Sequence, residues 1–191
     1  MTTTRLVRST FTAAAHPTTA KVAQTAVRAL ERKRRMLGFL RGDEYSRISN
    51  VVGATIGQHL RHSIDHFQRC AACIGDTETA PKAIHYDQRD RGGNLESDPA
   101  LALAAIDDLQ RMLHAASPVS LRRPCRPFFM LSETGSDEHE FSSNLERELF
   151  FCVHHGMHHD AMIGIILREW GHEPREGFGL APSTARYRAL S

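Results

Sequence analysis

Apolar side chains recur every three to four residues in four segments of the chain, which is the period of an amphipathic α-helix. The segments run from about Thr18 to Leu40, from Ser49 to Gly75, from Asp98 to Ser117 and from Ser142 to Gly171. The third has the clearest boundaries, because Asp98 can cap a helix, Pro99 suits its first position and Pro118 ends the pattern. The pattern therefore predicts four long helices.

A strand with regular alternation of apolar and polar residues is harder to find. The stretch VSLRRPCRPFFMLSE, residues 119–133, comes nearest, but its prolines argue against a strand. The expected fold class is therefore all-α, a four-helix bundle with two long loops at about 76–97 and 118–141. We expect residues 1–17 to form a flexible N-terminus and residues 18–191 to form a single helical bundle domain.

Composition narrows the class of partner. The chain has 191 residues, 41% of them hydrophobic, which suffices for one core. A formal net charge of +2 gives no field that would attract nucleic acid, and the apolar runs are too short for a membrane span. We therefore expect neither a nucleic-acid nor a membrane partner, while a homodimer stays open.

Four cysteines in a chain of this size do not form a disulfide scaffold, which favours a reducing, cytoplasmic location. The first twenty residues are rich in Thr and lack acidic side chains, and they fit either a frayed N-terminus or an organelle transit peptide.

Histidines are concentrated in two of the expected helices. The fourth helix carries FCVHHGMHHDAMI, in which two pairs have i, i+4 spacing and so could each hold a metal ion: His154 with His158, and His155 with His159. Apolar neighbours favour the second pair as the inward one. The second helix carries GQHLRHSIDHF, in which His59 lies on the apolar stripe. His62 or His66 could replace His59 as the third ligand. Zinc and nickel both suit imidazole.

The motifs QHLRH and ERELFFCVHHGMHHDAMI together resemble the DinB-like superfamily of metal-binding four-helix bundles, and the resemblance extends from about Lys21 to Tyr187. It implies His59, His155 and His159 as ligands of a divalent metal ion, with zinc or nickel the best candidates. It also implies a metal-dependent enzyme that transfers a low-molecular-weight thiol to an electrophile, or a metal-dependent hydrolase. The alternative is a non-enzymatic metal-binding or small-molecule-binding protein with a structural metal site.

Charged residues outside the helices offer a ligand contact. Arg89 and Arg91, in HYDQRDRGGNLESD, could clamp a substrate or cofactor carboxylate, or form structural salt bridges instead. Glu148, seven residues before His155, could orient a ligand histidine or lie on an exposed helix face. Cys152 fits a small buried residue better than a metal ligand.

Overall fold

The structure is a computed structural model that describes residues 17–75, 80–88, 94–134 and 137–190. In chain order these residues form α1 (Pro17–Leu37), α2 (Ile56–Gly75), β1 (Lys82–His85), the 3-10 helix η1 (Asn94–Glu96), α3 (Pro99–Ala115), α4 (Pro118–Leu121), β2 (Pro124–Met130), β3 (Glu138–Glu140), β4 (Ser143–Asn144), α5 (Leu145–Glu169) and α6 (Pro182–Leu190). Arg89 and Arg91, and residues 1–16 of the expected N-terminal segment, lie outside the described residues.

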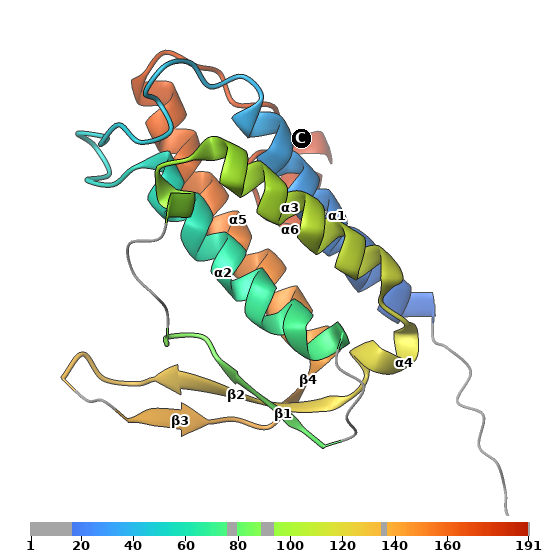
Figure 1. Cartoon of the computed structure of the whole chain (residues 1–191). Helices are drawn as coiled ribbons and strands as arrows, with labels where there is room; N and C mark the ends of the chain where they lie inside the picture. Colours follow the sequence, from blue (N-terminus) through green and yellow to red (C-terminus); the bar gives the residue numbers. More distant parts are fainter. Residues whose placement is uncertain (1–16, 76–79, 89–93, 135–136, 191) are drawn as a thin grey trace, which may run out of the picture.

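Four long helices, α1, α2, α3 and α5, lie side by side and enclose the core (Figure 1). Their apolar faces meet as the helical period predicted, and the buried side chains include Leu30, Ile56, Leu60, Phe67, Ile106, Leu109, Leu149, Ile163 and Leu167. Helices α2 and α5 share the most extensive contact between two elements of the described residues. This pair carries both histidine clusters.

A small mixed sheet covers the end of the bundle formed by the C-terminal half of α2 and the N-terminal half of α5 (Figure 1). Strand β1 runs parallel to β2, with Lys82 opposite Cys125. Strands β3 and β4 both run antiparallel to β2. The predicted all-α four-helix bundle is therefore wrong: the two long connections contain a four-stranded sheet and short helices.

The two prolines of β2 explain why the sequence argued against a strand in this segment. Pro124 is the first residue of the strand. Pro127 accepts a hydrogen bond from Phe141 N through its carbonyl oxygen (2.8 Å), so its backbone polar groups face the side of β3 and β4. Pro127 lies between the β2 residues that pair with β4 and the β2 residues that pair with β3. Pro127 therefore keeps one bond to Phe141 and lacks the second, so the cost of the proline is one ladder bond in the gap between β3 and β4.

The boundaries of two helices differ from the predicted ones. Ser49 does not cap α2, which begins six residues after Asn50: Thr55 and Gln58 form a capping box, in which Gln58 N donates to Thr55 Oγ1 (2.9 Å) and Thr55 N donates to Gln58 Oε1 (3.0 Å). Helix α5 is capped by Asn144, whose Oδ1 accepts from Arg147 N at 2.9 Å. Asp98 caps α3 as predicted.

The described helices include none that is long and apolar enough to cross a membrane.

Candidate metal centre

Helices α2 and α5 bring five histidines together where they face each other near the sheet. His59, His62 and His66 come from α2, and His155 and His159 come from α5. His154 and His158 are exposed, so the pair at 155 and 159 is the one that faces α2. The i, i+3 and i, i+4 spacings align each set along one helix face, and the packing of the two helices apposes the sets.

Three imidazole nitrogens converge within this group. Nε2 of His155 lies 3.0 Å from Nε2 of His62 and 3.1 Å from Nε2 of His159. One ligand atom from each of the three residues lies within 4.8 Å of the others. In a tetrahedral zinc site, nitrogens at about 2.0–2.1 Å from the metal are about 3.4 Å apart. The two measured spacings, from His155 to His62 and from His155 to His159, are therefore within a few tenths of an ångström of the spacing in a zinc site.

Hydrogen bonds donated by His155 cannot satisfy both of its neighbours in this arrangement. A neutral imidazole carries one N–H, so His155 can donate through Nε2 to one neighbour and not to both. Burial, followed by the charges of His62 and His155, lowers the pKa of His159 to about 2. His159 is thus neutral near pH 7. A neutral imidazole is the form that binds metal ions.

His59 contacts the edge of this cluster. Its Nδ1 lies 3.0 Å from Nδ1 of His159, the ring nitrogen that does not face His155. Its Nε2 is buried with no hydrogen-bond partner, and burial lowers the pKa of His59. The predicted ligand His59 is therefore in contact with His159, while the position facing Nε2 of His155 is taken by His62.

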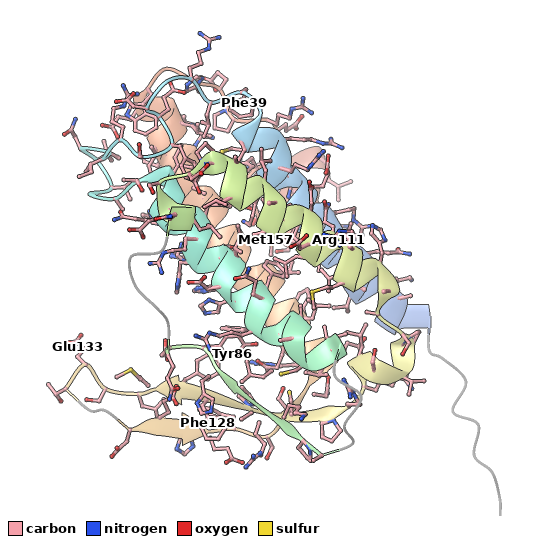
Figure 2. All side chains as sticks on the ribbon, viewed as in Figure 1. Phe39, Tyr86, Arg111, Phe128, Glu133 and Met157 are labelled. Carbon is pink, nitrogen blue, oxygen red and sulfur yellow. The ribbon has the colours of Figure 1, made fainter. Side chains whose placement is uncertain are left out.

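His66 lies on the other side of the cluster. Its Nδ1 is 3.0 Å from the carbonyl oxygen of His62, one turn earlier, which fits an Nδ1–H donor. Its ring stacks on Tyr86, the residue after β1, at a centroid distance of 5.0 Å. Figure 2 shows Tyr86 between the sheet and the bundle. The sequence did not indicate that Tyr86 contacts the histidines, because the predicted four-helix bundle gave no reason to place residues 82–86 over them.

Aromatic rings from the sheet and α5 complete the surroundings. Tyr86 stacks on Phe129 of β2, and Phe151 stacks on His155 at 5.7 Å between centroids. Cys152 is buried and donates from Sγ to the carbonyl oxygen of His66 (3.3 Å). Glu148 accepts hydrogen bonds from Ser143 and Arg147. The predicted arginine contacts cannot be placed, because both arginines lie outside the described residues.

No family model matches the chain, and no solved structure matches it. FK506-binding protein 5 of Rhizopus delemar is 34% identical over 111 residues, which are 58% of this chain and 29% of that protein. The chain thus matches less than a third of the length of that relative.

This relative overturns the predicted function. The chain was expected to be a DinB-like metal-dependent thiol transferase or hydrolase, whereas the relative is named for binding FK506. The predicted transferase or hydrolase is therefore wrong, and the comparison does not favour the structural-metal alternative either. The resemblance to the superfamily is not tested by these comparisons and stays a prediction.

Proposed function

We propose that the protein binds one divalent metal ion, zinc or nickel, at the Nε2 atoms of His62, His155 and His159. The observation that carries the proposal is the convergence of these nitrogens at 3.0 and 3.1 Å. Imidazole suits both metals, and three nitrogens leave a coordination position for a ligand. A metal ion in such a site acts as a Lewis acid toward a ligand in that position.

His59 has a supporting part in this proposal. Metal-binding histidines usually donate their second N–H to a neighbouring group, and this contact fixes the ring. Nδ1 of His159 lies 3.0 Å from Nδ1 of His59, which is the contact such a role requires. His59 therefore orients His159 and does not itself bind the metal.

The ligand set is tested by metal titration of single variants. Calorimetric titration of the metal-free protein with zinc should give one site per chain. His62→Ala, His155→Ala and His159→Ala should each remove it, while His59→Ala should keep the stoichiometry and weaken affinity by about 10- to 100-fold. His154→Ala and His158→Ala are matched controls, since these exposed side chains lie on the same helix. Loss of the site in His59→Ala with retention in His62→Ala would reverse the assignment.

A second candidate function is the binding of a bulky, largely apolar ligand. The name of the relative supports it, and so does a pocket of about 410 Å³ beside the histidines. Phe129, Phe141 and Phe151 form its aromatic walls. Titration with FK506 itself tests this candidate: saturable binding that Phe141→Ala weakens is expected, and no saturable binding up to the solubility limit would exclude FK506 as a ligand.

A further inference from the structure

The aromatic pocket lies between the sheet and the first turns of α5. Pro127, Phe129 and Leu131 alternate along β2 and the residue after it, so their side chains share one face. Arg147, Glu148 and Phe151 of α5 form the facing wall, and Phe141, Ser142 and Ser143 close one side. Phe151 belongs both to this wall and to the stack on His155, so the pocket adjoins the candidate metal centre.

Two apolar side chains of the pocket are left open to solvent. Leu131 is 68% exposed and Phe141 is 43% exposed. A scattered exposed apolar residue requires no explanation, but here two of them line the same cavity as the partly buried rings of Phe129 and Phe151. A ligand with an apolar ring would cover these surfaces and gain their burial.

The same wall contains a buried carboxylate that the protein satisfies only in part. Glu148 is fully buried, and its Oε1 accepts hydrogen bonds from Ser143 Oγ (2.6 Å) and from Arg147 (2.7 Å). Its Oε2 is buried and has no hydrogen-bond partner. A buried carboxylate oxygen without a donor is costly, and so it favours a ligand that brings one.

The charge around Glu148 favours a cationic donor. Arg147 is the cation that contacts it, and the Arg147 side chain is 60% exposed and bonded to Oε1, so solvent screens its charge. Charge-assisted hydrogen bonds from an ammonium group to a carboxylate are about twice as strong as neutral ones. Oε2 is therefore better satisfied by an ammonium group than by a hydroxyl group or a neutral amide.

We propose that this pocket binds a primary alkylamine that carries an aromatic ring, whose ammonium group donates to Oε2 of Glu148 while its ring packs against Phe129, Phe141 and Phe151. The proposal rests on the second candidate function, since it names the polar group that the ligand of that pocket carries. It does not depend on a metal ion at the histidines.

Three probes of nearly equal shape separate the polar contact from the apolar one. Calorimetric titration of the full chain uses 2-phenylethylamine, propylbenzene and 3-phenylpropanoate, which offer the ring with a cation, with no polar group and with an anion. The amine should bind at least about tenfold more tightly than the hydrocarbon, because a hydrogen bond to a charged group contributes about 1.5–3 kcal/mol. The anion should bind most weakly.

Variants then assign the contact to its residue. Glu148→Gln keeps an acceptor for Ser143 and Arg147 and removes the charge, so amine affinity should fall to the level of the hydrocarbon while hydrocarbon affinity stays unchanged. Phe141→Ala should weaken the amine and the hydrocarbon alike. Met130→Ala is the matched control, because Met130 is 44% exposed on the opposite face of β2 and should affect neither.

The outcomes separate the inference from the function on which it rests. Equal binding of amine and hydrocarbon would leave a ligand pocket and overturn the role of Glu148. Tightest binding of the anion would assign recognition to Arg147 and likewise overturn the proposal. No binding of any probe would overturn the pocket as a ligand site together with the inference. Since the comparison of probes uses the unaltered protein, it decides the matter even if Glu148→Gln does not fold.

Discussion

His159 and Asp160 are neighbours in the sequence, yet they enter two different buried polar groups. His159 faces α2 and joins His62 and His155. Asp160 faces α1 and forms a fully buried ion pair with Lys33, whose Nζ also donates to the carbonyl oxygen of Gly156 at 3.1 Å. A Cβ at Gly156 would make an ordinary contact with Lys33 Nζ at 3.5 Å and a tight one with Ser63 Oγ at 3.0 Å, so the glycine eases the close approach of α2 to α5.

The difference lies in how each group is balanced. At the ion pair, the positive charge of Lys33 and the negative charge of Asp160 compensate each other within the chain. At the histidines, ring nitrogens face one another at 3.0 and 3.1 Å, and no acidic side chain is among the groups that shift the pKa of His159. The charges of the first group balance within the chain, which fits a structural role, whereas the second group is compatible with a metal ion, as proposed above.

Breaking the ion pair should have the largest effect on stability. Asp160→Asn leaves Lys33 buried without its counter-charge and should reduce the free energy of unfolding by about 3–5 kcal/mol. Urea unfolding of the metal-free protein measures this change. Asp107→Asn is the control, because the Arg34–Asp107 pair is about half exposed and should contribute less than about 1 kcal/mol. Equal losses in the two variants would contradict the structural role of the buried pair.

The histidine cluster should respond to added metal instead. Zinc at about 100 times its dissociation constant should stabilise the wild type by about 2.7 kcal/mol, because it binds the folded state. His62→Ala should fold without zinc and lose this gain, which thermal unfolding with and without zinc would show. A wild-type melting temperature that zinc leaves unchanged would remove the proposed distinction between the two polar groups.

Acid should affect the metal-free cluster in a defined direction. Since the folded-state pKa of His159 is lowered to about 2, the unfolded chain binds the proton more readily below pH 6.5. The neutral, buried His159 therefore costs no stability above pH 6.5. Below pH 6.5 the free energy of unfolding falls with the pH, by up to about 1.4 kcal/mol per pH unit. Urea unfolding should therefore show that the free energy of unfolding declines less between pH 7 and pH 5 in His159→Gln than in the wild type. Identical slopes would contradict a neutral, buried His159.

A surface contact at the far end of α5 should give the smallest effect. Glu169 accepts hydrogen bonds from Ser49 Oγ and from Asn50 N (2.9 Å), and these bonds, Ser49 first, lower its pKa. The stabilisation is present above the ordinary glutamate pKa and is lost as the pH falls below it. Glu169→Gln should lower the melting temperature slightly at pH 7 and not at pH 3. A difference that persists at pH 3 would show that the charge is not responsible.

The sequence allowed the helices to be placed well because their apolar residues are periodic and Asp98–Pro99 marks a boundary. The same periodicity pointed to the face of α5 that carries His155 and His159. It could not place the sheet, because β1 is four residues long and β2 contains two prolines whose acceptance depends on the pairing of neighbouring strands.

The sequence also could not identify which histidine of α2 is the third candidate ligand. His59 and His62 are three residues apart and share a helix face, and which of them meets His155 depends on how α2 is rotated against α5. Tyr86 and Phe129 reach the site only through the sheet, so no local pattern could indicate them. Helical spacing left Glu148 open between orienting a ligand histidine and lying on an exposed face, and the structure instead buries it against Ser143 and Arg147.

The most direct test of the account is X-ray absorption spectroscopy at the zinc edge of the full chain loaded with one equivalent of zinc. The account predicts three imidazole nitrogens at about 2.0–2.1 Å from the zinc ion. His62→Ala should reduce this number to two, and His59→Ala should leave it at three. A sulfur ligand at about 2.3 Å, or a spectrum that His62→Ala leaves unchanged, would contradict it.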